Sequence, residues 1–329
     1  MRTDLLPAST ATQRQKAIAY AVKLLRKGEI VALPTETVYG LAADALDPIA
    51  VAKIFEAKER PRFDPLIVHL PNREWLERIA HLTSNDREMI LTLADKFWPG
   101  PFTMVLPKRE IIPDIVSAGL DTVAVRISAH PVFSDIVGAL GKPLAAPSAN
   151  RFGQVSPTTA LHVLDELEGR IPLIIDAGPT EHGLESTIIA VQDGRIRILR
   201  CGPITAEQLS EFANLDTVAP MQKIACPGQL PSHYAPKTPL ELVDTAENYS
   251  LKRPERVGLL AWRPIESFQR FAAVRQLSQE QDHREAAANL FRYLRELDAL
   301  GLDCIIAERV PSRGLGAAIM DRLERASHR

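Results

Sequence analysis

The sequence predicts an α/β fold in two domains. Apolar, strand-like segments alternate with helical patterns along most of the chain, which is typical of sheets covered by helices. The length of 329 residues exceeds what one hydrophobic core usually fills. Five prolines and little periodicity mark residues 214–239 as an interdomain linker. We therefore expect a larger domain at 1–213 and a smaller α/β domain at 240–329.

In the first domain, apolar residues at helical spacing predict a helix over 12–27, which Gly28 ends. A short strand at 29–33 follows, and Asp47-Pro48 caps a helix that runs to about residue 57. Asp193-Gly194 predicts a two-residue hairpin. The remaining expected strands are 66–70, 102–106, 122–128, 171–176, 183–189 and 195–200, and the remaining helices are 86–97, 131–140, 158–168 and 205–212.

The second domain repeats this alternation on a smaller scale. Its expected strands are 240–243, 257–261, 271–277 and 304–310, and its expected helices are 284–297 and 317–325. The segment Arg313–Ile319 begins like a dinucleotide-binding loop. Ile319 stands where a third small residue is needed, so we interpret the segment as a helix entry.

Composition limits the possible functions. A formal net charge of −2 gives no overall electrostatic attraction to nucleic acid or to an anionic membrane. Cys201, Cys226 and Cys304 lie far apart, without the spacing of a disulfide framework or a zinc site. No signal-peptide core and no run of membrane-spanning length is present, so we expect a cytoplasmic protein.

A cluster of cations precedes the strand at 66–70. Lys58, Arg60 and Arg62 alternate with other residues, and would converge on one side if the segment were extended. Pro61 and Pro65 argue against a helix there. Such a cluster suits a polyphosphate, because Arg offers a planar fork of donors and Lys a mobile charge. Taken alone, the stretch is more typical of a solvated charged turn.

Three further segments carry polar candidates. In the strand at 122–128, Thr122 and Arg126 share the face opposite the apolar one, where Arg126 either lines a cleft or is exposed. Ser148 and Asn150 follow a run of small residues and form either a ligand loop or an ordinary turn. In the linker, a His-Tyr pair that includes Tyr234 suggests a segment folded over the protein, although a stiff spacer fits the composition equally well.

The P-loop, kinase, GxSxG and HExxH motifs are all absent. Instead, five motifs resemble, in order, those of the L-threonylcarbamoyladenylate synthases, in the two-domain form called Sua5 rather than the single-domain YrdC form. They are 34–41 (PTETVYGL), the Lys58/Arg60 pair, 147–150 (PSAN), 186–189 (STII) and the linker segment 227–236. The chain departs from the family pattern at Cys201-Gly202-Pro203, which leaves the loop after Arg200 uncertain.

The resemblance implies a YrdC-like twisted mixed sheet with flanking helices and a concave active-site cleft, followed by a smaller Rossmann-like α/β domain. It also implies a reaction in which L-threonine, bicarbonate and ATP give threonylcarbamoyl-AMP and pyrophosphate, the first step of the t6A modification of tRNA. Downstream threonylcarbamoyl transferase machinery would be a partner, and contact with tRNA would be weak or indirect.

The resemblance further implies a role for each matching residue. Catalysis would use Lys58, Arg60, Ser148 and Asn150. ATP would contact Lys58, Arg62, Thr122, Ser148, Ser156, Arg200 and Tyr234. Threonine and bicarbonate would contact Thr35, His69, Arg126, Ala146 and Ser186. Mg2+ would be held by the ATP phosphates, with no protein side chain as a ligand.

Two other functions compete with this one. An RNA-binding module of the same fold class would act in tRNA maturation, but the net charge and the lack of aromatic platforms among basic runs count against it. A related transferase that uses carbamoyl phosphate would need zinc-finger-like and acylphosphatase-like segments, which this sequence lacks.

Overall fold

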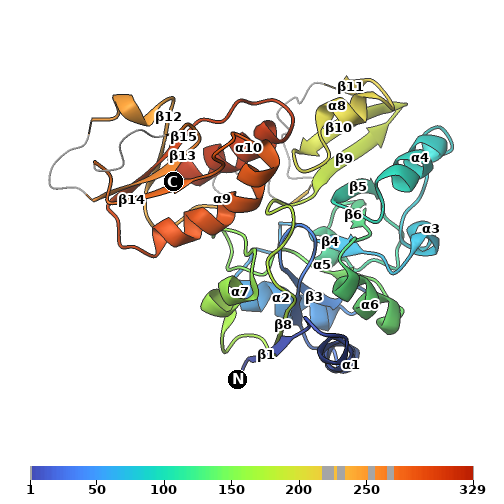
Figure 1. The fold of residues 1–329 in the computed structure, drawn as a ribbon. Helices are drawn as coiled ribbons and strands as arrows, with labels where there is room; N and C mark the ends of the chain where they lie inside the picture. The colour runs from blue at the N-terminus through green and yellow to red at the C-terminus, as the bar shows by residue number, and fades with distance from the viewer. Residues whose placement is uncertain (1, 217–225, 228–233, 251–255, 265–269, 329) are drawn as a thin grey trace.

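The computed structural model describes residues 2–216, 226–227, 234–250, 256–264 and 270–328. Within them the chain forms two sheets, each with its own helices, and the two domains lie side by side (Figure 1). The predicted α/β class is confirmed. No helix in the described ranges is long and apolar enough to cross a membrane.

The first domain is built on a mixed sheet whose described strands follow the order β1-β8-β2-β3-β7-β4-β6-β5-β9-β10-β11. At its centre, β4 pairs with β6 in parallel and with β7 in antiparallel fashion, as a mixed sheet requires. The strands are β1 (Asp4–Pro7), β2 (Val31–Leu33), β3 (Gly40–Asp44), β4 (Ile67–His69), β5 (Phe102–Pro107), β6 (Thr122–Arg126), β7 (Leu144–Ala145), β8 (Leu173–Asp176), β9 (Thr187–Gln192), β10 (Arg195–Arg200) and β11 (Leu215–Asp216).

Helices α1 and α2 of this domain begin at side-chain caps, of which the sequence indicated Asp47 and not Thr10. Thr10 forms a capping box with Gln13 at the start of α1, and Asp47 accepts hydrogen bonds from the first amides of α2. The helices are α1 (Ala11–Arg26), α2 (Pro48–Lys58), α3 (Leu76–Ile79), α4 (Arg87–Phe97), α5 (Asp114–Ser117), α6 (Pro131–Leu140), α7 (Ala160–Leu167) and α8 (Ala206–Ser210), with a 3-10 turn η1 (Arg73–Trp75).

Four strands were not predicted, each for a physical reason. β3 consists largely of small residues and is buried throughout, so it has no polar–apolar alternation to detect. β7 has only two residues, and β1 ends in a proline at the edge of the sheet. β11 lies within the range expected to be linker, and it pairs with β10.

The second domain contains a parallel sheet with the order β12-β15-β13-β14. Its alternation of strands and helices agrees with the Rossmann-like arrangement that the sequence suggested. The elements are β12 (Leu240–Val243), a 3-10 turn η2 (Ala246–Asn248), β13 (Val257–Ala261), β14 (Ala273–Gln276), α9 (His283–Asp298), β15 (Cys304–Glu308) and α10 (Leu315–Ser327).

One hydrophobic core joins the two domains. Val38 and Leu184 of the first domain pack in the same buried cluster as Phe291 of α9 and Leu323 of α10. Gly183 lies so close to α9 that a Cβ there would meet backbone atoms at 2.6 Å. The second domain is therefore seated directly against the segment that leads into β9.

Candidate functional site

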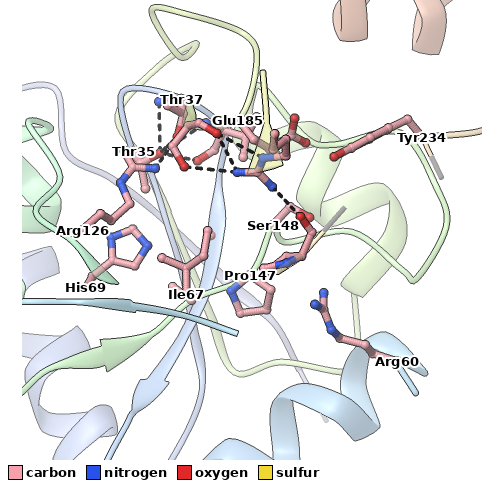
Figure 2. A pocket seen from close by; sticks show the side chains of 16 residues that line it. Thr35, Thr37, Arg60, Ile67, His69, Arg126, Pro147, Ser148, Glu185 and Tyr234 are labelled. Carbon is pink, nitrogen blue, oxygen red and sulfur yellow. Dashed lines mark hydrogen bonds between the residues drawn. The ribbon is translucent and has the colours of Figure 1, made fainter. Parts of the chain in front are cut away.

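A pocket lies where the ends of β4 and β6 meet the loops after β2 and β7 and the segment before β9 (Figure 2). It brings together nine of the residues selected from the sequence. These are Thr35, Arg60, His69, Arg126, Ala146, Ser148, Ser186, Arg200 and Tyr234. Its other lining residues are Thr37, Val38, Gly40, Ile67, Pro147, Glu185 and Pro227.

Strand pairing in the sheet determines which residues lie at each end of this pocket. In the parallel pair β4 and β6, His69 lies opposite Arg126, so both side chains reach the same end. An isolated bridge joins Gly40 to Ser148 and brings the loop after β7 over β3. Figure 2 shows Arg126 and His69 at one end of the pocket, Arg60 and Tyr234 at the other, and Ser148 between them.

Arg126 is buried and already has a carboxylate partner. Its Nη2 donates to Glu36, and its Nη1 donates to Thr37 Oγ1 at 3.2 Å. Burial alone would raise the pKa of Glu36, but Arg126 and the Ser128 hydroxyl bring that pKa down to about 2. Among the described residues, Nε of Arg126 has no hydrogen-bond partner. Part of the guanidinium therefore remains available to a ligand.

His69 lies beside Arg126 in an apolar setting. Its ring is 4.6 Å from that of Phe133, between centroids. Burial, and then the neighbouring Arg126 charge, lower the pKa of His69 to about 3. Its Nδ1 is buried and has no hydrogen-bond partner within the described ranges. At neutral pH this imidazole is uncharged, so one ring nitrogen can donate a hydrogen bond and the other can accept one.

Lys58 lies behind the Ser148 loop rather than in the pocket lining. Its fully buried ammonium donates to the carbonyl oxygen of Ser148 at 2.6 Å and to that of Asn150. Burial, then the Arg60 charge, lower the pKa of Lys58 to about 7. Asn150 is also buried outside the lining, and its amide donates to the carbonyl oxygens of Arg151 and Gln154 at 2.8 Å. Both side chains hold the loop that presents Ser148.

The three cations near residue 60 do not converge on one side. Lys58 still belongs to α2, and Glu59 ends that helix in the left-handed region with φ 54°, so the segment is not extended there. Arg60 turns into the pocket and pairs with Asp64 at 2.9 Å, while Arg62 is exposed and outside the lining. Asp64, whose pKa burial raises, was not selected from the sequence.

Arg200 also lines the pocket. Its guanidinium donates to the Ser186 carbonyl at 3.0 and 3.1 Å and to the Ser186 hydroxyl at 3.1 Å, and it reaches the Pro227 carbonyl at 3.3 Å. Ser186 is fixed in turn by a 2.7 Å hydrogen bond with Thr103. The linker residue Pro227 is thereby tied to the pocket.

Besides Lys58 and Arg62, two further predicted nucleotide contacts lie outside the lining. Thr122 is half-buried at the start of β6, four residues from the pocket end of that strand. Ser156 is fully buried and donates to Glu185 Oε1 at 2.5 Å. The roles of both residues stay predictions, as do those of Lys58, Arg62 and Asn150.

Sequence reasoning missed two carboxylates. Glu36 lies inside the PTETVYGL motif, and Glu185 comes directly before the STII motif. Their position within the motifs is the signal that could have found them. No cluster of three or more His, Cys, Asp or Glu side chains suited to a metal occurs in the described part of the chain.

Three buried arginines, Arg60, Arg126 and Arg200, line the pocket, with polar groups at both ends; Asp64 and Glu36 pair with the first two. An α/β domain with such a cleft defines a protein that binds an anionic small molecule or nucleotide.

Comparison with known proteins specifies the family. Residues 23–202 match the Sua5/YciO/YrdC family model, described as telomere recombination, and residues 204–328 match the threonylcarbamoyl-AMP synthase C-terminal domain. The threonylcarbamoyl-AMP synthases of Pyrococcus abyssi and Bacillus subtilis are 39% and 40% identical to this chain, with 94% of it covered in each case and 94% and 92% of the relatives. The chain belongs to the threonylcarbamoyl-AMP synthase family, in its two-domain Sua5 form.

Solved structures agree. The crystal structure of P. abyssi Sua5 complexed with L-threonine has a TM-score of 0.87 at 36% identity and covers 99% of this chain and 98% of its own. Escherichia coli YciO, at 21% identity and a TM-score of 0.52, covers 61% of this chain and 96% of its own, and shares the fold of the first domain. The resemblance inferred from five motifs is confirmed.

Proposed function

We propose that this chain makes threonylcarbamoyl-AMP and pyrophosphate from L-threonine, bicarbonate and ATP. One observation carries the proposal: a single pocket joins a buried arginine beside a neutral histidine to a second end lined by Arg60 and Arg200. The first end suits an amino acid and the second a polyphosphate. Relatives named for this activity match nearly the whole chain.

The chemistry needs positioning more than it needs a nucleophilic side chain. The threonine amine loses a proton and forms a carbamate with carbon dioxide derived from bicarbonate. A carbamate oxygen then bonds to the α-phosphorus of ATP, and the bond from that phosphorus to the bridging oxygen breaks to release pyrophosphate. Carbamates decompose in water, so a buried pocket that holds the reacting atoms in line supplies much of the catalysis.

At the amino-acid end, Arg126 is the proposed partner of the threonine carboxylate. Glu36 holds Nη2, so the substrate carboxylate would accept a hydrogen bond from Nε, for which no described residue is a hydrogen-bond partner. The uncharged His69 would face the amine, where an imidazole nitrogen can accept a hydrogen bond from it. Thr35, Ala146 and Ser186 complete the proposed threonine and bicarbonate contacts.

At the phosphate end, Arg60 and Arg200 would neutralise the triphosphate, with Ser148 and Tyr234 as further contacts. The hydrogen bonds of Lys58 to the Ser148 loop support an indirect role, in which Lys58 fixes the phosphate-facing backbone. Mg2+ would arrive with ATP and neutralise phosphate charge. Oxygen atoms of the phosphates and waters suit that ion without a protein cage.

The product also points to partners. Threonylcarbamoyl-AMP is a reactive mixed anhydride, so we propose that it passes to a threonylcarbamoyl transferase acting on tRNA. With a net charge of −2, this chain would touch tRNA weakly or indirectly. The wide spacing of the three cysteines and a need for ATP favour a cytoplasmic location.

The test is pyrophosphate release by the purified chain with ATP, Mg2+, threonine and bicarbonate. We expect release only when threonine and bicarbonate are both present, and release that ignores threonine would refute the substrate assignment. Arg126→Met should raise the KM for threonine at least tenfold. Arg195→Met is the matched control, because Arg195 is exposed and pairs with Asp216 outside the pocket lining, and it should leave this KM unchanged.

A further inference from the structure

A fully buried arginine of the second domain pairs with a residue that lines the pocket of the first domain. Arg322 lies in α10 and is fully buried. Its Nε pairs with Glu185 Oε2 at 2.9 Å, and its Nη2 donates to the Cys201 carbonyl at 3.0 Å. Its Nη1 pairs with the neighbouring Asp321. Two of these contacts cross from one domain to the other, on either side of β9 and β10.

Arg322 also supports Tyr234. The guanidinium carbon lies 5.1 Å from the centroid of the tyrosine ring, within the range of a cation–π contact. Phe291 of α9 stacks on the same ring, with centroids 5.5 Å apart and planes inclined by 25°. Tyr234 has φ 62°, a conformation that is costly for a non-glycine residue and persists where surroundings fix it. The second domain therefore sets the orientation of a side chain that lines the pocket.

The partner of Arg322 is the one carboxylate among the residues found to line the pocket. Glu185 is exposed to 9% at its side chain and accepts a hydrogen bond from Ser156 at its other oxygen. Burial would raise the pKa of Glu185, but the charges of Arg322 and Arg200 lower it, so the group is ionised at neutral pH. Without a buried cation behind it, this charge would repel an anionic ligand.

We propose that Arg322 is a positioning residue for the nucleotide end of the pocket, and that the second domain thereby completes the site. It acts in two ways. It neutralises the charge of Glu185, so that this carboxylate does not repel the phosphates, and it holds the ring of Tyr234 in place. This inference rests on the proposed function for the identity of the ligand, ATP. It gives the second domain a role in substrate binding, exerted through Arg322.

A purely structural role for Arg322 predicts something different. The loss of a domain contact would lower stability, and would affect both substrates to a similar extent. The proposal instead predicts a selective effect on ATP, because Arg126 and His69 lie at the opposite end of the pocket (Figure 2). The ratio of the two KM changes therefore separates the two roles.

The first variant is Arg322→Met, which keeps most of the volume and removes the charge. We expect the KM for ATP to rise at least tenfold while the KM for threonine changes less than about twofold. Arg309→Met is the matched control: Arg309 belongs to the same domain, is half exposed and pairs with Glu324 and Asp244 away from the pocket. Unchanged KM for ATP in a folded Arg322→Met protein, or equal changes for both substrates, would overturn the proposal.

Two further variants cover a folding failure and divide the two actions. Removing one partner of a buried ion pair leaves an unpaired charge, so Arg322→Met by itself is at risk of unfolding. The double variant Arg322→Met/Glu185→Gln removes the charge at position 185 as well. We expect it to fold, with an ATP affinity between those of wild type and the single variant. Arg322→Lys should also be intermediate, since an ammonium pairs with Glu185 but offers no planar group to Tyr234. If none of the three variants folds, Arg322 serves stability alone and the proposal is wrong.

Direct binding keeps this test separate from that of the reaction. Calorimetric titration with ATP and Mg2+ needs no turnover. If the wild-type chain binds ATP but releases no threonine-dependent pyrophosphate, the proposed reaction fails while the Arg322 comparison still stands. If Arg322→Met binds ATP as tightly as wild type, the positioning role fails whatever the reaction is.

Discussion

The Glu36–Arg126 pair allows a quantitative prediction for Glu36→Gln. Both side chains are 4% exposed, and Glu36 also accepts a hydrogen bond from Ser128. The pKa of Glu36 falls from 4.5 to about 2 in the folded protein. At about 1.4 kcal/mol for each pKa unit, the folded state favours the ionised form by about 3 kcal/mol. Glutamine imitates the protonated acid, so the variant should lose about this free energy of unfolding at pH 7.

The direction of the Glu36 pKa shift determines how the stability of the fold depends on pH. Because folding depresses this pKa, the stabilisation is fully present above pH 4.5 and disappears as the pH falls toward 2. Wild type should therefore lose about 3 kcal/mol over that interval through Glu36, a loss that Glu36→Gln should not show. Any acid sensitivity left in the variant must come from other groups.

The assay is urea and thermal unfolding of wild type and variant at pH 7. For a domain of this size, about 3 kcal/mol corresponds to a fall in midpoint of about 6–12 °C. Glu77→Gln is the control, because Glu77 also pairs with an arginine, Arg87, but is half exposed, and such surface pairs contribute less than about 1 kcal/mol. If Glu36→Gln is as stable as Glu77→Gln, the buried pair does not stabilise the fold as argued.

Three other substitutions test particular contacts. Lys58→Met removes the donor to two carbonyls behind Ser148 and should lower kcat/KM for ATP at least a hundredfold in steady-state assays; wild-type activity would exclude a role for Lys58. Gly202→Ala should destabilise by more than about 1 kcal/mol in urea unfolding, since a Cβ there would meet backbone atoms at 2.4–2.7 Å, whereas the matched Gly138→Ala, in open space on α6, should be neutral or stabilising. Tyr234→Ala should weaken ATP binding in calorimetry, and unchanged affinity would return the linker tyrosine to the role of a spacer.

Local patterns predicted the elements that carry the site. Alternation along β6 correctly separated Arg126 from the apolar face, because neighbouring side chains of a strand point to opposite sides. Caps such as Asp47 fixed the start of α2. These features depend on residues within a few positions of each other, which is why they can be recognised without a structure.

Contacts between segments that are distant in the sequence could not be predicted from such local patterns. Nothing near Glu36 in the sequence shows that Arg126 will be its partner, and the helix that carries Arg322 had no visible link to Glu185. The direction of Lys58 was missed for a local reason: the left-handed turn at Glu59 separates it from Arg60, and glutamate seldom adopts that conformation.

The place of β8 in the sheet has a consequence for biosynthesis. Residues 173–176 lie between β1 and β2 and pair with both, so until β8 has been made β1 lacks this partner and β2 has only β3 beside it. At roughly 5–20 residues per second, the ribosome takes on the order of ten to thirty-five seconds to reach that point. During this time Val31 and Leu33, fully buried in the finished protein, lack part of their cover. We expect nascent chains that stall before residue 173 to bind chaperones, and those that extend well past it to be released.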